Sequence, residues 1–184
     1  TGKIIDQAPY DAFSPQHLEA AMQALRGDIE QMPPAFSAVR IDGERAYARA
    51  RRGEAVVLAT RQVTVLALQQ TAWRPPDFDF VLECSKGTYV RSLITEIGRH
   101  LGCGATLTKL RRVRSGSYHI AQSIPLAEVE ARAKISSAEI PLVPIDEVLS
   151  AYPVVTIEQN EVLNFIRGQP LDPRGPEDTL LRVH

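Results

Sequence analysis

Apolar residues recur at the helical spacing of three to four positions in two stretches of the chain. The first stretch starts at Ser14-Pro15, which suits an N-cap and a first helical residue, and Gly27 can end it. The second stretch follows Gly87 and stops at Gly102. Each is predicted to be a helix with one buried face. The residues on those faces are Leu18, Ala21, Met22 and Leu25 in the first helix, and Val90, Leu93, Ile94, Ile97 and Leu101 in the second.

Strand patterns occupy much of the chain between these helices. Residues 61–72 and 78–84 are rich in strand-forming residues, and a pair of prolines separates them. A shorter strand is predicted over 35–41, followed by a turn at Asp42-Gly43 and a short helix over 44–51. The prolines and turn residues between these strands favour antiparallel connections.

The chain after the second helix predicts shorter elements. Residues 102–120 contain a Gly-rich loop, a basic segment and a strand pattern, and two short helices are predicted within 124–150. Beyond a boundary near Tyr152-Pro153, residues 154–157 predict a strand and residues 160–168 a helix. This mixed order of helices and strands indicates an α+β arrangement with antiparallel strands rather than a regular βαβ alternation.

The composition is that of an ordinary globular protein. Of the 184 residues, 44% are hydrophobic and 23% are charged, which allows one sizeable core and a small appendage. No apolar run is long enough to cross a membrane. Two cysteines, Cys84 and Cys103, make a poor disulfide framework and suggest reduced thiols in the cytoplasm. The four histidines are scattered without metal-ligand spacing, so no zinc site is expected.

Positive charge is concentrated in two segments, although the net charge is −1. Residues 86–114 hold seven Lys or Arg against the single acid Glu96, a balance of +6, which leaves −7 for the rest. Residues 40–61 hold six arginines against three acids. One basic run can be a solvated surface. Two runs in an otherwise acidic chain favour a face that binds a polyanion, most simply nucleic acid.

The junction of strand and helix at CSKGTYVRSL (84–93) has features of an anion site. Gly87 lets backbone N–H groups approach a ligand in front of the positive helix N-terminus. Arg91 lies in the first helical turn, where the helix dipole disfavours a cation, so a negative group is expected in front of it. Simpler alternatives are open: a local salt bridge for Arg91, packing over the helix start for Tyr89, and a core position for Leu110.

Two long segments carry linked motifs at fixed spacing, QMPPAFSAVRIDGERAYARARRGE (31–54) and CSKGTYVRSLITEIGRHLGCGATLTKLRRVRSGSY (84–118). Together they resemble the bacterial TruB-type tRNA pseudouridine synthases. The resemblance runs from the first residues to about residue 150 and is weaker beyond. The GCGA stretch is similar to that of the stand-alone bacterial enzymes. The resemblance implies isomerisation of uridine to pseudouridine in the T-loop of tRNA, at position 55, with no cofactor and no metal.

The resemblance also implies a pseudouridine synthase fold, a mixed and mostly antiparallel sheet flanked by helices, with an RNA-binding loop insertion at about 33–54. Within it, Arg91 would pair with a nucleophilic aspartate, Tyr89 would contact the target base and Leu110 would pack in the pocket. A flipped base suits such an aromatic face and apolar floor. The residues implied to bind the T-arm of tRNA are Arg40, Tyr47 and Arg49 in the insertion, and Lys86, Lys109, Arg111 and Arg112 in the basic segment.

The nucleophilic aspartate of the family lies in a Gly-x-Leu-Asp-Pro-x-Ala-Thr-Gly motif that this sequence lacks. Leu171-Asp172-Pro173 matches three letters of it, but it lacks Ala-Thr-Gly and follows the arginine motif instead of preceding it, so we reject it. The chain is therefore expected to be the C-terminal part of such an enzyme, inactive without the missing N-terminal part. Residues 1–151 are predicted to belong to the catalytic domain, and 152–184 to an incomplete, PUA-like RNA-binding domain.

Two other functions remain open from the residues. One is a non-catalytic RNA-binding fragment that grips the T-arm, and the other is an unrelated enzyme that binds phosphate at the 84–93 junction. The residues upstream of Thr1 would discriminate the first from catalysis, because a nucleophile motif there would indicate an enzyme.

Overall fold

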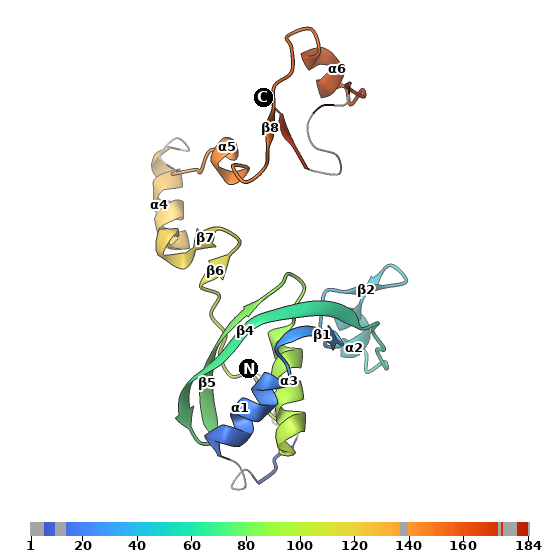
Figure 1. Ribbon diagram of the computed structural model, residues 1–184, viewed down its shortest axis with the longest axis vertical. Coiled ribbons are helices and arrows are strands. Elements are labelled where there is room, and N and C mark those ends of the chain that lie inside the picture. Colours follow the sequence, from blue (N-terminus) through green and yellow to red (C-terminus); the bar gives the residue numbers. More distant parts are fainter. Residues whose placement is uncertain (1–5, 10–13, 137–139, 173, 175–179, 184) are drawn as a thin grey trace. The chain divides into compact units, whose positions relative to one another are not determined.

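The computed structural model describes residues 6–9, 14–136, 140–172, 174 and 180–183 (Figure 1). The chain forms two compact units, residues 1–111 and 112–184. None of the described helices is both long enough and apolar enough to cross a bilayer.

An antiparallel three-stranded sheet forms the centre of the first unit. Its strands are β1 (Gly27–Gln31), β4 (Arg61–Arg74) and β5 (Asp77–Cys84), in the order β1-β4-β5. A turn at Pro75-Pro76 joins β4 to β5, where the sequence predicted a break between two strands. The β4–β5 register shifts near Ala67 and again near Ala72, and such bulges increase strand twist. Figure 1 shows β4 as a long, bent ribbon.

Two predicted helices, α1 (Pro15–Gln23) and α3 (Val90–Leu101), share a core with this sheet. The Ser14 hydroxyl caps α1 by accepting a hydrogen bond from the His17 backbone N–H, and Gly102 ends α3 in the left-handed conformation at φ 77°. The largest fully buried side chains are Leu18 and Met22 from α1, Val65 and Leu68 from β4, and Leu93 and Ile97 from α3.

A small excursion connects β1 to β4, and we call its residues 39–54 the basic hairpin. It contains β2 (Arg40–Ile41), β3 (Glu44–Arg45) and α2 (Ala46–Arg51). Strand β2 pairs with β3 in antiparallel fashion, and the Ala46 backbone N–H donates to the Val39 carbonyl (2.7 Å). Ala46 is fully buried and anchors the base of the hairpin, whereas none of the hairpin's arginines is buried.

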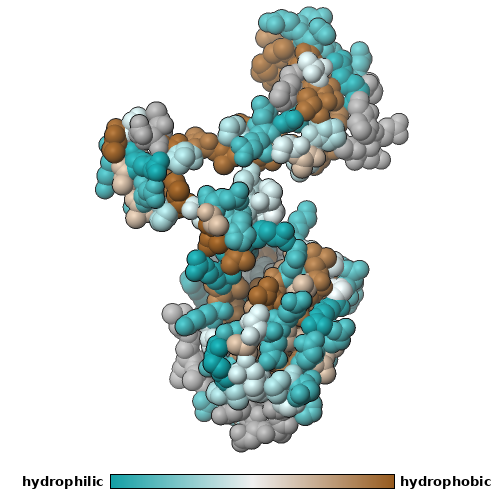
Figure 2. All heavy atoms as spheres, turned by 60° about the vertical axis from the view of Figure 1, so that its left-hand side comes forward, coloured by the Kyte–Doolittle hydropathy of each residue, from teal (hydrophilic) through white to brown (hydrophobic). Residues whose placement is uncertain are grey.

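The second unit consists of short elements. They are β6 (Arg114–Ser115), β7 (Tyr118–His119), the 3-10 helix η1 (Ile120–Gln122), α4 (Leu126–Ile135), α5 (Ile145–Val148), β8 (Val154–Val155), α6 (Val162–Ile166) and β9 (Arg182–Val183). Strand β6 pairs with β7 in antiparallel fashion, and β8 with β9 in parallel. None of the described residues of this unit is buried, and Figure 2 shows apolar side chains (brown) on its surface.

Two features of the region before β4 differ from the sequence predictions. The strand predicted over 35–41 is limited to Arg40–Ile41, because carbonyls of the preceding loop accept hydrogen bonds from α3 instead of from a strand. Strand β1 was not predicted. Its inward positions are Ile29 and Gln31, and a buried glutamine hides the alternating pattern. The other predicted helices and strands are present within a few residues of their expected ends.

Candidate active site

The turn between β5 and α3 is fastened to β4. Within it, Gly87 has φ 85°, a left-handed conformation that favours glycine. The Ser85 hydroxyl accepts a hydrogen bond from the Thr64 backbone N–H (2.9 Å), and the Ser85 N–H donates to the Thr64 carbonyl (2.8 Å). The Thr88 hydroxyl donates to the Ser85 carbonyl (2.9 Å). Together these bonds fix the point at which α3 begins.

Tyr89, the N-cap residue of α3, is held by Gln31 of β1. Gln31 is 3% exposed; its amide oxygen accepts a hydrogen bond from the Tyr89 N–H (2.6 Å), and its amide nitrogen donates to the Tyr89 carbonyl (3.2 Å). The guanidinium of Arg61 lies over the Tyr89 ring, 5.4 Å from its centroid, in cation–π geometry. The Tyr89 side chain is half-buried, so both packing and contact with a ligand are open to it.

Arg91 reaches back from the first turn of α3 to the loop after β1. Its Nη2 donates a hydrogen bond to the Phe36 carbonyl (2.8 Å), and the residue is exposed. It forms no salt bridge with any described acid, so the alternative of a local salt bridge is wrong for the described part of the chain. A guanidinium has five N–H donors in a planar fork. Arg91 can therefore hold a carboxylate or a phosphate in addition to that carbonyl.

The loop over residues 31–36 forms a wall beside the start of α3. The Ser92 hydroxyl donates to the Met32 carbonyl (2.7 Å), in addition to the bonds made by Gln31 and Arg91. Met32 and Phe36 expose 55% and 56% of their surface at this wall. The wall thus presents apolar surface next to the Arg91 guanidinium.

The sequence predicted no role at this site for Gln31, Phe36 or Arg61. Phe36 carried the signal of an aromatic residue two positions after a pair of prolines, within a motif that was already singled out. Gln31 and Arg61 carried no such signal, because their roles come from contacts with Tyr89, which lies far along the chain.

Ion pairs inside the basic hairpin neutralise part of its charge. Arg49 pairs with Asp42 (3.3 Å) and Glu44 (3.4 Å), and Arg52 pairs with Glu44 (2.6 Å) and Glu54 (2.5 Å). The hydrogen bond from Arg52, with a smaller contribution from Arg49, lowers the pKa of Glu44 below its ordinary value. Arg49, a predicted RNA contact, is therefore engaged within the hairpin itself.

The other predicted RNA contacts of the hairpin face solvent. Arg40 is exposed and donates a hydrogen bond to the Gly43 carbonyl (3.1 Å). Tyr47 is 37% exposed and lies under the Arg51 guanidinium, 5.4 Å from ring centroid to charge. The arginines of residues 40–61 that form no salt bridge with a described residue are Arg40, Arg45, Arg51 and Arg61. These cations remain available to an anion.

The segment around the Arg-Arg pair is open to solvent. Lys86, Lys109, Arg111 and Arg112 are all exposed. Leu110 is 64% exposed, so the alternative of an ordinary core leucine is wrong. Tyr89 and Arg91 lie two residues apart at the start of α3, and both are bound to residues 31–36, Tyr89 by Gln31 and Arg91 by the Phe36 carbonyl. The structure records no contact between Leu110 and either of them, and the pocket role of Leu110 stays a prediction.

Carboxylates and thiols elsewhere in the described residues form no recognisable centre. No cluster of His, Cys, Asp and Glu among these residues is arranged to bind a metal ion. Asp172 is an exposed residue of the second unit, and Pro173 beside it lies outside the described residues. Cys84 and Cys103 are free and half-buried. The described site thus gathers the Arg91 guanidinium, an apolar wall and the Tyr89 ring around the start of α3, an arrangement suited to a planar ligand with a negative group beside it.

Comparison with known protein families identifies the class. Residues 1–90 match the family model described as TruB family pseudouridylate synthase (N terminal domain). Residues 91–151 match the model of the tRNA pseudouridylate synthase B C-terminal domain. The chain therefore belongs to the TruB family of pseudouridine synthases, as its motifs indicated.

Curated relatives named tRNA pseudouridine synthase B extend this match. The relative from Ectopseudomonas mendocina (strain ymp) is 34% identical over 186 residues, covering 99% of this chain and 60% of the relative. The relative from Parasynechococcus marenigrum (strain WH8102) is 46% identical over 132 residues, covering 71% of this chain and 45% of the relative. The chain thus spans about half the length of the curated relatives it matches.

Solved structures share the fold. A Cbf5-Nop10-Gar1 complex matches with a TM-score of 0.64 and 24% identity, over 86% of this chain and 46% of that one. An H/ACA RNP bound to a substrate RNA containing 2′-deoxyuridine matches with a TM-score of 0.66 and 20% identity, over 95% of this chain and 51% of that one. The predicted α+β pseudouridine synthase fold is confirmed. The predicted domains, residues 1–151 and 152–184, stay a prediction.

Proposed function

We propose that this chain is part of an enzyme that isomerises uridine to pseudouridine in tRNA, at position 55 of the T-loop. The family and the names of the relatives support this reaction class. The observation that carries the proposal is Arg91, a guanidinium at the start of α3 that binds one carbonyl and no described carboxylate. Such a cation, two residues along the chain from the half-buried Tyr89, suits a nucleophilic carboxylate and a flipped base.

In the proposed reaction the base stays on the same sugar but becomes attached to it through a different ring atom. The bond between N1 of uracil and C1′ breaks, the base turns, and a bond forms between C5 and C1′. The proton on C5 is lost, and N1 gains a proton. Nothing is oxidised and no group is imported. The protein has to position a nucleophile, hold the base while it turns and keep water out.

Each named residue has a distinct role in this proposal. Arg91 orients the carboxylate, because its planar fork can bind both oxygens at once. Tyr89, fixed in place by Gln31 and Arg61, offers its aromatic surface to the base. Leu110 closes the pocket on its apolar side. The carboxylate comes from outside residues 1–184, and the chain by itself is inactive.

The T-arm of tRNA is the proposed partner of the exposed cations. Lys86, Lys109, Arg111, Arg112 and Arg40 contact phosphates, Tyr47 offers an aromatic surface, and Arg49 acts mainly by holding the hairpin in shape. Because such contacts release counterions, affinity for a T-arm hairpin should fall steeply between about 50 and 200 mM salt. The cytoplasm is the proposed location, which fits two free cysteines.

A second candidate function is binding of the T-arm without catalysis. The lack of a carboxylate partner for Arg91 among the described residues favours it. In that case the chain binds RNA through the same cations and never forms pseudouridine, whatever protein segment is added. Binding and isomerisation therefore have to be measured separately.

Tritium at C5 of the target uridine gives a direct assay, since C5 loses its hydrogen in the reaction. We expect no tritium release from a T-arm hairpin with this chain alone. We expect release once the part of the Ectopseudomonas mendocina relative outside the matched residues is supplied as well. Release by the chain alone would contradict the proposed origin of the carboxylate, and Asp172 would be the first residue to test. Binding without release in both mixtures would support the non-catalytic function.

Substitution Arg91→Lys in the supplemented enzyme tests the role of the arginine fork. Lysine keeps the charge but cannot hold two oxygens in one plane, so the single-turnover rate should fall by about two orders of magnitude. RNA affinity and melting temperature should stay near those of the parent. Arg99→Lys, on an exposed position of the same helix, is the matched control. A near-normal rate would contradict the assignment, and a smaller salt slope of binding would indicate a phosphate contact instead.

A further inference from the structure

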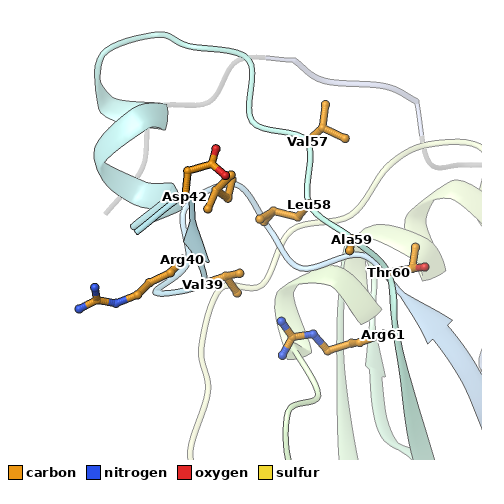
Figure 3. Close-up of a pocket in the computed structure, with 9 residues that line it drawn as sticks. Val39, Arg40, Asp42, Val57, Leu58, Ala59, Thr60 and Arg61 are labelled. Carbon is orange, nitrogen blue, oxygen red and sulfur yellow. The ribbon is translucent and has the colours of Figure 1, made fainter. Parts of the chain in front are cut away.

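A hollow of about 550 Å³ lies between the basic hairpin and the segment that leads into β4. Its lining residues are Val39, Arg40, Ile41 and Asp42 from the hairpin, and Val57, Leu58, Ala59, Thr60 and Arg61 from the other side. Figure 3 shows Leu58 and Arg61 extending toward the hairpin, whereas the guanidinium of Arg40 extends away from it. The hollow therefore combines an apolar floor with one inward cation.

Arg61 gives this hollow a positive charge. It forms no salt bridge with any described residue, and it is exposed only in part. Asp42, the only acid in the lining, is paired with Arg49 (3.3 Å). The charge left inside the hollow is positive, so an anionic group is the complementary occupant.

Arg61 also connects the hollow to the candidate active site. One face of its guanidinium lies over the Tyr89 ring, 5.4 Å from the centroid. Its Nη1 is 3.8 Å from where a Cβ on Gly87 would lie, so it also approaches the turn in front of α3. A planar guanidinium can stack on a ring through its face and still donate hydrogen bonds from its edge. A ligand in the hollow would therefore lie one side chain away from the base that Tyr89 contacts.

We propose that this hollow binds the nucleotide next to the isomerised uridine, with its phosphate on Arg61 and its base on the apolar floor. The inference rests on the proposed function, because the target base is placed by its contact with Tyr89. A strand whose target base lies against Tyr89 carries an adjacent phosphate past Arg61. The base of that nucleotide then meets Val39, Ile41 and Leu58.

The lining fits a whole nucleotide better than a free phosphate. A phosphate alone would use Arg61 and leave the apolar floor without a contact. A nucleotide uses both, and the exposed Thr60 hydroxyl can bond to its base edge or to a ribose 2′-hydroxyl. Enzymes that act on a flipped base take part of their sequence preference from contacts to the flanking nucleotides. The hollow is thus a specificity site for the neighbour of the target.

Abasic RNA tests the base contact with the full 184-residue chain. T-arm hairpins are prepared with the base removed at the position before or after the target uridine, and affinity is measured by fluorescence anisotropy. Removal of one of the two neighbours should weaken binding on the order of tenfold, a typical effect of losing one stacked base. Ala59→Phe fills the hollow from an exposed position. This variant should bind intact RNA about as weakly as the parent binds the abasic RNA, with no further loss on the abasic RNA.

Matched controls separate this effect from general changes. Ala55→Phe adds the same ring to a nearby exposed residue outside the lining, and it should discriminate as the parent does. In a further RNA, a neutral methylphosphonate replaces the phosphate beside the target uridine. This RNA should bind more weakly than intact RNA to the parent and to Arg45→Gln. Arg61→Gln should bind both RNAs with the same affinity, because its contact with that phosphate is already lost. Arg45 lies in the same hairpin and outside the lining. Circular dichroism melting curves verify that each variant is folded.

Equal affinity of the parent chain for intact and both abasic hairpins would overturn the proposal, as would parent-like discrimination by Ala59→Phe. Failure of the chain to bind any T-arm hairpin would overturn it as well. The tritium assay keeps the two proposals apart. One possible result is that only Ala59→Phe fails to distinguish intact from abasic hairpins and that the supplemented enzyme forms no pseudouridine. The hollow would then remain an RNA site, and the proposed activity would be wrong. If the supplemented enzyme isomerises the uridine and removal of the neighbouring bases has no effect on affinity, the proposed activity would stand and the proposed nucleotide site would be wrong.

Discussion

Residues 1–111 and 112–184 differ in where their apolar side chains lie. Among the described residues, every buried hydrophobic one belongs to the first unit, in or just after α1, in the sheet, in α3 or in the excursion. In the second unit none of the described residues is buried, and large apolar side chains such as Ile135, Leu142 and Ile145 are at least 76% exposed. The first unit can be stabilised by burial, whereas the second gains little from it.

Because the second unit buries little apolar surface, polar contacts account for a larger share of its stabilisation. Arg174 makes two hydrogen bonds to the Glu161 carboxylate (2.6 and 3.1 Å), and Arg132 pairs with Glu128 one helical turn away (2.6 Å). Its strands β8 and β9 are two residues long each. Contacts of this kind are individually weak in water. The two units are therefore expected to respond differently to core substitutions and to pH.

The largest expected effect is that of a core truncation in the first unit. Leu68→Ala removes a fully buried side chain that packs with α1 and α3, and should lower the free energy of unfolding by about 2–5 kcal/mol. Leu163→Ala in the second unit, where the side chain is 61% exposed, should change it by less than about 0.5 kcal/mol. Urea denaturation followed by Trp73 fluorescence and by circular dichroism measures both. Equal losses would remove the distinction between the units.

A smaller effect is expected for Gly98→Ala in α3. An alanine usually stabilises a helix by about 0.5–1 kcal/mol over glycine. At this position, however, a Cβ would overlap the backbone of Gly104 and Ala105, which cross the helix there. We expect a net loss of about 1–3 kcal/mol because the crossing segment has to move. A gain in melting temperature would show that this loop does not pack on α3.

The smallest expected effect concerns the ion pair of the second unit. The hydrogen bonds from Arg174 hold the pKa of Glu161 below its ordinary value, so the folded pKa is lower than the unfolded one. The pair therefore contributes stability above the ordinary carboxyl pKa, and this contribution is lost as pH falls through the lowered folded pKa. The protection of amides in the 154–172 region against hydrogen exchange, taken relative to the intrinsic exchange rate at each pH, should fall on acidification in the parent. In Glu161→Gln this protection should already be lower at neutral pH and should change less with acid.

Local patterns in the sequence predicted most elements of the first unit. Helices α1 and α3 carry their own caps and apolar spacing, and two prolines mark the turn between β4 and β5. The loop before the hairpin could not be predicted, because its carbonyls bind the side chains of Arg91 and Ser92 from a distant helix. No local pattern records a contact of that range.

The candidate site also contains residues that the sequence predicted and residues that only the structure shows. Tyr89 and Arg91 were assigned from a contiguous motif, and the structure places them at the N-cap and in the first turn of α3. The partners that hold them, Gln31 and Arg61, come from β1 and the first residue of β4. Their part in the site depends on strand pairing. The sequence did not predict that pairing, because the pattern of β1 does not show a strand.

The hydrogen bonds between the 31–36 wall and α3 have a consequence for the order of folding. They join residues 55 to 60 positions apart in the chain. Such distant contacts form late, because the entropy of closing the intervening loop is lost before the contacts compensate for it. Helix α3 can form from local interactions, but Tyr89 and Arg91 reach their working positions only after β1 has joined the sheet. During refolding, affinity for the target base should therefore appear after helical content has been regained.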